Sequence, residues 1–556
     1  MNTTPTGPAA PVWLADPTHG TSESDRLWTT TNIAEAVSDV LSPLCCSFWR
    51  DLCDLAARDG LWDLGLLTPA ERRTGDDQNQ QTNGCFYGRL ALNADLIRHF
   101  LGRLPGSFAD DFERDLLGMV RTDAPDTATS WRTALTAAAK TPVAIARHPA
   151  TVRRLYRRQL AWWQQTAFAP DSEPYVLLDE AARRFRYAMR VHLRSRLLAQ
   201  GLYSALQGLA AAAGRPDLYL PAITGLGGVT ETAMSQALWD AAHGRLERQE
   251  FLHRHGFHGL HEGNLTGRSW RQEPARLDPL LAAYRRQPAE RRPETQARLT
   301  QEARRQALAD LAAALPARKR LLAHAATRRL GGYVRLLELS KASFVMALDT
   351  ARTAASGIGR YLAGAGVLDA PQDACYLTMA EIQNGEACTD ARQIVAFRRA
   401  CREQHRSVQL PPVFTGMPAP LPVPRSAPAG LDTDTKEPDI GPVTGTGAGG
   451  GVAEGRIRLI DDLSDADRFQ PGEILLCRTT DPSWTTLFTF AAAVVIDTGG
   501  LGSHGAIVAR EFGIPCVIGT GNGTQRLRSG DAVRVDGAVG TVHRLNPSSL
   551  SNLLEQ

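Results

Sequence analysis

One stretch, residues 497–515, reads DTGGLGSHGAIVAREFGIP and decides the fold of the C-terminal part of the chain. It follows an apolar run of strand length, Ala491 to Ile496, and opens with a glycine-rich turn. Ser503 is a favourable N-cap residue and Gly513 a favourable C-terminal stop. The stretch therefore predicts a strand, a tight turn and a short helix over residues 505–512.

His504 lies at the start of this predicted helix. The unpaired backbone N–H groups and the positive end of a helix favour an anion at such a position. An imidazole with an ordinary pKa near 6.5 is largely neutral at pH 7, so a ring nitrogen is available as a nucleophile. The position suits a histidine that carries a phosphoryl group, and the alternative is a capping or core histidine beside a tight turn.

The composition sets broad limits on the class of protein. A chain of 556 residues is long enough for roughly two to four domains. The net charge of +3 gives no reason to expect a nucleic acid or an anionic membrane as partner. No apolar run reaches the ~18 residues of a membrane span, and the N-terminus lacks the features of a secretory signal. Nine scattered cysteines without a CxxC pair favour a reduced, cytoplasmic protein over a disulfide scaffold or a zinc site.

Most of the chain has a helical pattern. Residues 1–23 are expected to be a flexible tail, and residues 24–410 a mainly helical domain with apolar residues three and four apart. The predicted helices include Thr151–Thr166, Leu177–Ala212, Glu231–His255 and Gln296–Thr327. The run at residues 153–163 mixes arginines with tryptophans. In so arginine-rich a chain it indicates a solvated helix face above a tryptophan-containing core rather than an RNA site.

Residues 411–447 are rich in proline and then in glycine, which predicts a linker between bodies that move independently. The linker contains a GxGxxG match at Gly445, Gly447 and Gly450. A dinucleotide fingerprint needs a strand before it and a helix after it. Here a proline-rich segment precedes the match and a β-like run follows, so we reject a nucleotide site.

Residues 448–546 form a compact α/β unit in this interpretation, and residues 547–556 a frayed tail. Asp536-Gly537 is turn chemistry between the last two strands. The expected strands are Val452–Ile460, Glu473–Thr479, Ala491–Ile496, Cys516–Ile518, Ala532–Val535 and Thr541–Leu545.

The α/β unit resembles the phosphohistidine swivelling domain of phosphoenolpyruvate-utilising enzymes, whose hallmark is T-G-G-x-x-S-H-x-A-I-x-A-R-E-x-G-I-P. Residues 498–515 match it, residues 480–485 resemble an upstream T-D-P-x-W-T element, and residues 452–456 resemble V-x-E-G-R. The resemblance implies that His504 becomes phosphorylated. The phosphoryl loop would be Thr498, Gly499, Gly500 and Ser503, whose hydroxyls hold phosphoryl oxygens and whose glycines allow close approach.

The helical part resembles, more weakly, the substrate domain of rifampin phosphotransferase-like proteins. The matching segments are residues 28–32, 41–44, 83–88, 104–106 and 376–382. The fold class predicted for the whole chain is therefore multidomain: a large, mainly α-helical substrate domain plus a small α/β (β/β/α) swivelling phosphohistidine domain.

The family's H-R-G-x-x-E segment is altered here to Phe257-His258-Gly259-Leu260-His261-Glu262. We assign His258, His261 and Glu262 to substrate binding. His253 and His255 lie nearby and raise the question of a metal site, but the spacing is not specific enough, and no metal is predicted.

The family's R-E-x-x-K pattern reads Leu337-Glu338-Leu339-Ser340-Lys341, which keeps the glutamate and the lysine. Three residues apart, Glu338 and Lys341 share one helix face. They form either a surface ion pair or a catalytic pair, in which Glu338 is the general base for a hydroxyl and Lys341 steadies phosphoryl charge. Only four of the 62 basic residues are lysines, which tilts the choice towards function.

The chain starts at the helical part, without the ATP-grasp domain that these enzymes ordinarily carry, and contains no cofactor motif of its own. The main hypothesis is a phosphotransferase that acts on a small-molecule hydroxyl through phosphorylated His504. A separate ATP-grasp partner would supply the phosphoryl group from ATP and Mg²⁺. A second hypothesis is a lyase or cyclase (dehydratase) of secondary metabolism that uses His504 as acid and base or is assisted by phosphorylation. A third is a non-catalytic binding protein.

Overall fold

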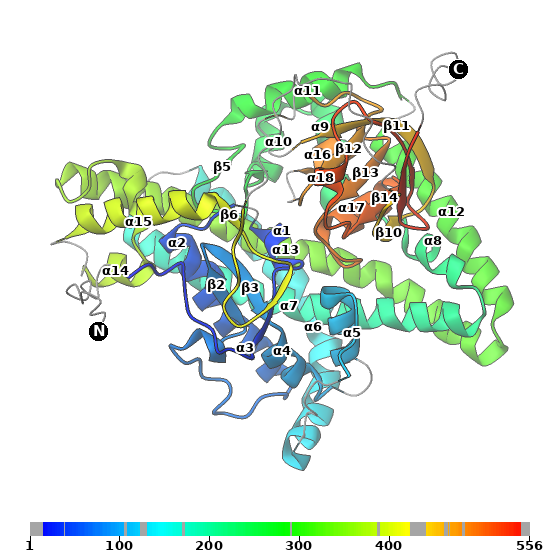
Figure 1. Cartoon of the computed structure of the whole chain (residues 1–556), viewed down its shortest axis with the longest axis horizontal. Helices are drawn as coiled ribbons and strands as arrows, with labels where there is room; N and C mark the ends of the chain where they lie inside the picture. Colours follow the sequence, from blue (N-terminus) through cyan, green and yellow to red (C-terminus); the bar gives the residue numbers. More distant parts are fainter. Residues whose placement is uncertain are drawn as a thin grey trace, which may run out of the picture.

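The computed structural model describes residues 15–37, 39–104, 108–122, 130–168, 173–228, 230–289, 292–385, 390–422, 441–460, 465, 468–480 and 484–545. The C-terminal tail, most of the N-terminal tail, residues 423–440 of the linker and residues 481–483 of the upstream motif lie outside these ranges. Figure 1 shows a large helical body with an α/β unit beside it. The predicted fold class is thus confirmed.

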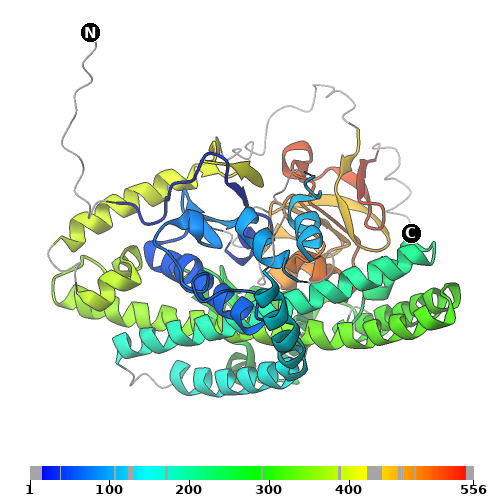
Figure 2. The same ribbon diagram turned by 90° about the horizontal axis from the view of Figure 1, so that it is seen from below.

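Three long helices form the frame of the body: α6 (Trp131–Ala167), α7 (Pro174–Ala212) and α13 (Ala317–Gly364). α7 and α13 pack along one another, as Figure 2 shows. α13 is buried almost all round over residues 342–355, where small and apolar side chains let its neighbours approach closely. None of the described helices combines the length and apolar character needed to cross a membrane.

Two of the predicted helices are each divided in the structure. The range Glu231–His255 holds α9 (Thr230–Ala242) and α10 (Arg248–His255), because Gly244 adopts a left-handed φ of 70° that ends the first helix. The range Gln296–Thr327 holds α12 (Pro293–Ala314) and the start of α13, because extended backbone at Pro316 separates them. In both places the apolar period continues across the break, which hides it from pattern analysis.

A small antiparallel sheet caps the body near its N-terminus. Its strand order is β2-β3-β1-β7, with β1 at Leu27–Thr29, β2 at Asn83–Phe86, β3 at Arg89–Asn93 and β7 at Val413–Thr415. The proline-rich residues after 411 therefore lie against the body as an edge strand. The remaining elements of the body are α1 (Ile33–Ala36), α2 (Pro43–Cys46), the π-helix η2 (Ser47–Leu52), α3 (Cys53–Asp63), η3 (Gln78–Gln80), α4 (Ala94–Leu101), α5 (Phe108–Leu117), η4 (Pro216–Leu218), α8 (Tyr219–Ile223), β4 (Gly259–Leu260), β5 (Arg268–Ser269), η5 (Pro274–Arg276), α11 (Leu277–Arg286), η7 (Pro371–Tyr376), α14 (Met379–Asn384), α15 (Ala391–Arg406), β6 (Val408–Gln409) and β8 (Leu421–Pro422).

The C-terminal unit is built on an eight-stranded mixed sheet of order β10-β14-β13-β12-β11-β15-β16-β9. Four central strands, β11 to β14, are parallel. The side chains of β12, β13 and β14 are buried on both faces, which explains their continuous apolar sequence. The strands are β9 (Val443–Thr444), β10 (Thr446–Gly449), β11 (Val452–Leu459), β12 (Ile474–Cys477), β13 (Ala493–Ile496), β14 (Cys516–Ile518), β15 (Ala532–Asp536) and β16 (Thr541–Arg544), and the helices are α16 (Thr485–Phe488), α17 (His504–Phe512) and α18 (Gly523–Arg526).

The structure differs from the predicted linker at its C-terminal end, because residues 443–447 belong to the sheet. β9 pairs with β16, and β10 pairs with β14. Glycine is required at Gly447 because the neighbouring backbone leaves no room for a side chain. A Cβ on Gly447 would lie 2.6 Å from the carbonyl oxygens of Gly537 and Ala538. Glycine-rich sequence thus marks close approach between strands as well as flexible chain.

The C-terminal unit packs closely against the body. Trp239 of α9 and Tyr284 of α11 belong to one hydrophobic cluster with Trp484 and Phe488 of the unit. At another contact, the carboxyl of Glu511 accepts hydrogen bonds from the backbone N–H groups of Leu226 and Gly227, at 3.0 and 2.9 Å. With these contacts the N-terminus of α17 lies against α13, where Nδ1 of His504 is 2.9 Å from Nζ of Lys341.

Candidate active site

A cavity of about 290 Å³ lies where the helical body meets the N-terminus of α17. Most of its lining is apolar and comes from α3, α4, α5, α7 and α13. His504, Lys341 and Glu338 line it as well, which brings the predicted catalytic residues together at one site. We call one group of lining residues the apolar part: Ala57, Leu61, Leu101, Phe108, Phe112 and Leu197. We call a second group the polar part: Glu35, Glu338, Lys341 and His504.

His504 is the first residue of α17. The Ser503 hydroxyl accepts the N–H of Ala506 at 3.3 Å as an N-cap, and Gly513 ends the helix with a left-handed φ of 66°. The His504 side chain is 10% exposed. Burial, followed by the positive charge of Lys341, lowers the pKa of His504 to about 3. The imidazole is therefore neutral at pH 7.

Lys341 of α13 joins His504 to two carboxyl groups. Its Nζ lies 2.9 Å from Nδ1 of His504, 2.8 Å from Oε1 of Glu231 and 3.8 Å from Oε2 of Glu338. Burial alone would lower the pKa of Lys341, but the carboxyls of Glu231 and Glu338 outweigh burial and raise it. Lys341 is thus an ammonium held between a carboxylate and an imidazole.

The two carboxyl groups beside Lys341 differ in charge. Burial and the neighbouring Glu231 raise the pKa of Glu338 well above its usual range. Burial also opposes the ionisation of Glu231, but Lys341 outweighs it and holds the pKa of Glu231 well below its usual range. Two close carboxyls share one proton, because both cannot ionise at low cost. Here Glu338 is the neutral member and Glu231 the ionised one.

Glu35 of α1 contacts the backbone of His504 rather than its side chain. Its Oε2 accepts the backbone N–H of His504 at 2.8 Å, the position that suits an anion at a helix N-terminus. Burial raises the pKa of Glu35 to about 8. A Cβ on Gly499 would lie 2.8 Å from Oε1 of Glu35, so glycine at this position lets the loop come so close.

Asp115 and Arg196 hold the rest of the predicted phosphoryl loop against the body. The N–H of Gly502 donates to Oδ1 of Asp115 at 3.2 Å, and Arg196 donates to the Gly502 carbonyl at 3.3 Å. A Cβ on Gly500 would lie 2.6 Å from the carbonyl oxygen of Asp115. Thr498 is tied through its backbone N–H to the carbonyl of Arg478 at 2.9 Å.

Of the predicted substrate-binding residues, His258 lies just before β4, and His261 and Glu262 lie in the turn between β4 and β5. Nδ1 of His258 lies 2.7 Å from Oε2 of Glu262, and both side chains are buried. Glu262 lines the cavity, and the charge of a protonated His258 would disfavour protonation of His504. His261 has a left-handed φ of 52° and shapes the turn.

Four polar residues at the site were not singled out from the sequence: Glu35, Asp115, Arg196 and Glu231. Glu35 stands in a short, largely apolar helical stretch, IAEA, where a buried carboxyl is unusual. Glu231 stands among polar residues at the start of α9 and has no such signal. The apolar stretch around Glu35 is the one signal the sequence offered. Their positions next to His504 depend on contacts between elements hundreds of residues apart.

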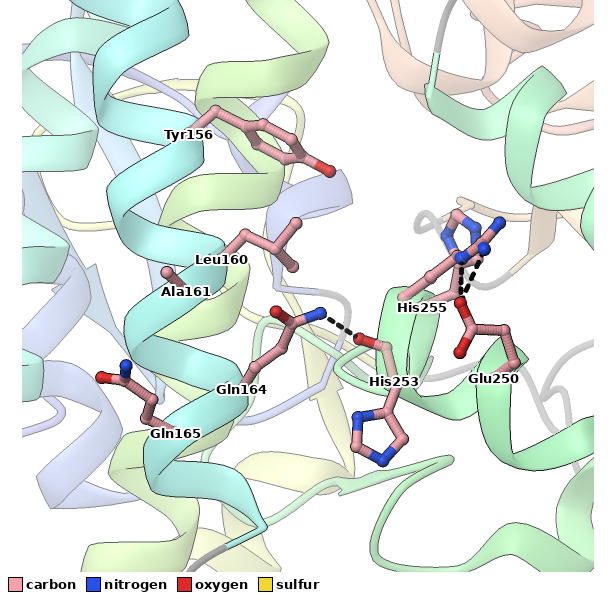
Figure 3. Close-up of a pocket in the computed structure, with 9 residues that line it drawn as sticks. Tyr156, Leu160, Ala161, Gln164, Gln165, Glu250, His253 and His255 are labelled. Atoms are coloured by element: carbon pink, nitrogen blue, oxygen red, sulfur yellow. Dashed lines mark hydrogen bonds and ion pairs between the residues drawn. The ribbon is translucent and has the colours of Figure 1, made fainter.

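A second hollow lies on the surface between α6 and α10 and shares no lining residue with the first (Figure 3). Gln164 donates to the carbonyl of His253 at 2.9 Å, and Glu250 is paired with Arg254. His253 stacks on Phe168 with ring centroids 4.1 Å apart. Among the residues described, no group of three His, Cys, Asp or Glu side chains could hold a metal ion.

Two protein-family models match the chain. Residues 469–540 match "PEP-utilising enzyme, mobile domain", which includes His504 and its loop. Residues 244–338 match "Rifampicin phosphotransferase fourth domain", which includes Glu262 and ends at Glu338.

Curated relatives match over parts of their length. An uncharacterized protein of Mycobacterium tuberculosis is 38% identical over 229 residues, which are 41% of this chain and 25% of that protein. An uncharacterized phosphotransferase of Bacillus subtilis is 35% identical over 33% of this chain and 22% of its own length. A rifampicin phosphotransferase of a Streptomyces species is 30% identical over 54% of this chain and 34% of its own length. The chain thus spans about a quarter to a third of these relatives, and it contains a mobile domain of the PEP-utilising enzyme family together with a domain of the rifampicin phosphotransferase type, as its sequence motifs predicted.

Proposed function

We propose that this protein is an enzyme that transfers a phosphoryl group from His504 to a hydroxyl of an apolar small molecule. The observation that carries the proposal is the position of His504 and Lys341 on the wall of a largely apolar cavity. The relatives named as phosphotransferases support this reaction type. A neutral imidazole at a helix N-terminus is suited to form and release a phosphoryl bond.

The acceptor would be held by the apolar part of the lining and would present its hydroxyl to the polar part. Burial of apolar surface supplies most of the binding free energy in such a site, and a few polar groups orient the ligand. Lys341 would balance the charge of the phosphoryl group. Glu338 holds a proton when the site is arranged as here, so a role as general base requires that it first lose this proton.

The phosphoryl group would come from ATP and Mg²⁺ through a separate ATP-grasp partner. In the cycle we propose, the C-terminal unit leaves the body to be charged and returns to deliver the group. The contact of Glu35 with the His504 N–H must then open and close, and so must the cluster around Trp484.

A lyase or cyclase is the second candidate. It is favoured by the hydrophobic cluster around Trp484, which joins the C-terminal unit to the body. An extensive apolar contact resists the separation of the two parts that charging of His504 by a partner requires. In this reaction neutral His504 would remove a proton while Lys341 or protonated Glu338 donates one to the leaving oxygen. A binding protein without activity has less support, since the whole loop from Thr498 to His504 is intact.

The test is phosphorylation by ATP and Mg²⁺ in the presence of candidate ATP-grasp proteins, followed by assay for acid-labile phosphate. We expect label in the wild type and in the control His543→Ala, an exposed histidine of the same unit. We expect none in His504→Ala. Label that persists in His504→Ala would exclude the phosphohistidine. Turnover of a substrate by the wild type without nucleotide would establish the lyase instead.

A further inference from the structure

Lys341 contacts one particular nitrogen of the His504 ring. Its Nζ is 2.9 Å from Nδ1, a hydrogen-bond distance, so one proton lies between the two atoms. Because Lys341 is an ammonium, it is the donor and Nδ1 the acceptor. A phosphoryl group on Nδ1 would need the place that Nζ of Lys341 occupies, so we assign the phosphoryl group to Nε2.

Glu231 fixes the direction of this contact. Its Oε1 is 2.8 Å from Nζ of Lys341 and 3.9 Å from Nδ1 of His504, so the carboxylate lies beside both groups. The side chains of Glu231 and Lys341 are 6% and 13% exposed, and little solvent competes for the ion pair. Glu338 is farther away, at 3.8 Å, and its Oε2 has no hydrogen-bond partner among the described residues.

The contact of Lys341 with Nδ1 bears on how well the imidazole of His504 can act as a leaving group. When a phosphoryl group leaves Nε2, the bonding electron pair stays on the ring. Without a proton on Nδ1 the ring would leave as imidazolate, a strong base and a poor leaving group. A proton delivered to Nδ1 during the step produces neutral imidazole, and such positioned acids accelerate reactions by about 10²- to 10⁴-fold.

We propose that Lys341 is the general acid that protonates Nδ1 of His504 as the phosphoryl group leaves Nε2, and that Glu231 is the positioning residue that aims it; this rests on the proposed phosphotransfer. The Nε2–P bond breaks and a P–O bond to the acceptor forms. The acceptor's hydroxyl proton passes to a phosphoryl oxygen. Lys341 gives its proton to Nδ1. After the transfer Nε2 takes up the proton that came from the acceptor's hydroxyl, and Nδ1 returns its own to Lys341, which restores the contact described above.

The experiment bypasses the unknown partner. Potassium phosphoramidate phosphorylates histidines chemically, and His504→Ala identifies the signal of His504 in ³¹P NMR. The loss of that signal is then followed with water and with benzyl alcohol, a small apolar probe, as acceptors. We expect Glu231→Gln to slow both reactions about 100-fold and Glu231→Asp to recover much of the rate, because a shorter carboxylate still pairs with Lys341. The control Glu302→Gln, on the outer face of α12, should react like the wild type.

A spectroscopic readout separates positioning from damage to the fold. The ¹⁵N shift of His504 Nδ1 reports the hydrogen bond it accepts, and it should move in Glu231→Gln and return in Glu231→Asp. Equal rates in the wild type and Glu231→Gln would overturn the role of Glu231 and leave the phosphohistidine standing. Failure of phosphoramidate to label His504 would instead count against the proposed function itself.

Discussion

The polar and apolar parts of the cavity lining are built in different ways. Each polar group is held by a contact from another element: α1 meets α17 through Glu35, and α9 meets α13 through Glu231 and Lys341. The apolar part comes from α3, α4, α5 and α7 and depends on shape alone. If the proposed function holds, the reaction and the choice of acceptor depend on different residues of the lining. Changes in the polar part should alter rates, whereas changes in the apolar part should alter binding.

The largest effect is expected from Lys341→Met. The substitution removes the ammonium beside Nδ1 of His504, and transfer from phosphorylated His504 should slow about 10³-fold. It also leaves Glu231 buried without its partner, which should cost roughly 3 kcal/mol in the free energy of unfolding. Single-turnover kinetics and chemical denaturation measure the two effects. Lys319→Met, on the same helix, is the control, and an equal loss there would assign the effect to α13 as a whole.

A change in pH tests whether Glu35, one member of the polar part, is neutral. Burial raises the pKa of Glu35 to about 8, whereas the unfolded chain releases this proton near 4.5. Between these values the folded state keeps a proton that the unfolded state has lost. The free energy of unfolding therefore falls as the pH rises through this window, by up to about 1.4 kcal/mol per pH unit from this group.

Glu35→Gln should remove that contribution and make the dependence shallower, because glutamine keeps an acceptor for the His504 N–H but does not titrate. Denaturation of both proteins at several pH values from 5 to 8 gives the two slopes. Glu338 also has a raised pKa, but it titrates in both proteins and cancels in the difference. Parallel slopes would mean that Glu35 is ionised throughout this pH range in the folded protein.

The apolar part is tested by Ala57→Leu, which adds side-chain volume to the cavity wall. An acceptor alcohol should bind about 10-fold more weakly, which is ~1.4 kcal/mol, because part of its space is filled. Hydrolysis of phosphorylated His504 by water should not change. Ala57→Ser keeps the volume and serves as the control. If Ala57→Leu slowed hydrolysis as well, the two parts of the lining would not be independent.

The sequence predicted the two parts to different extents. Ser503, His504 and Gly513 act over a few residues, so local rules predicted α17 nearly to its ends. Glu338 and Lys341 were identified from the resemblance to the family's R-E-x-x-K pattern, and their spacing places them on one helix face. The contact of Lys341 with Nδ1 of His504 joins residues 163 positions apart, and no local pattern specifies it. Leu61 and Phe112 look like any core residues, since a side chain that lines a cavity has the same pattern as one that fills a core.

The smallest effect is expected at Ser503, and it bears on how the polar part is held. Its hydroxyl caps α17 by accepting the N–H of Ala506, so Ser503→Ala should lower the free energy of unfolding by about 1 kcal/mol. Ser503→Asn restores a capping oxygen without the hydroxyl. If Ser503 only caps the helix, the asparagine variant should regain both stability and the labelling of His504. If the hydroxyl also holds a phosphoryl oxygen, stability should return while labelling stays low, because the amide does not place a donor at the same point.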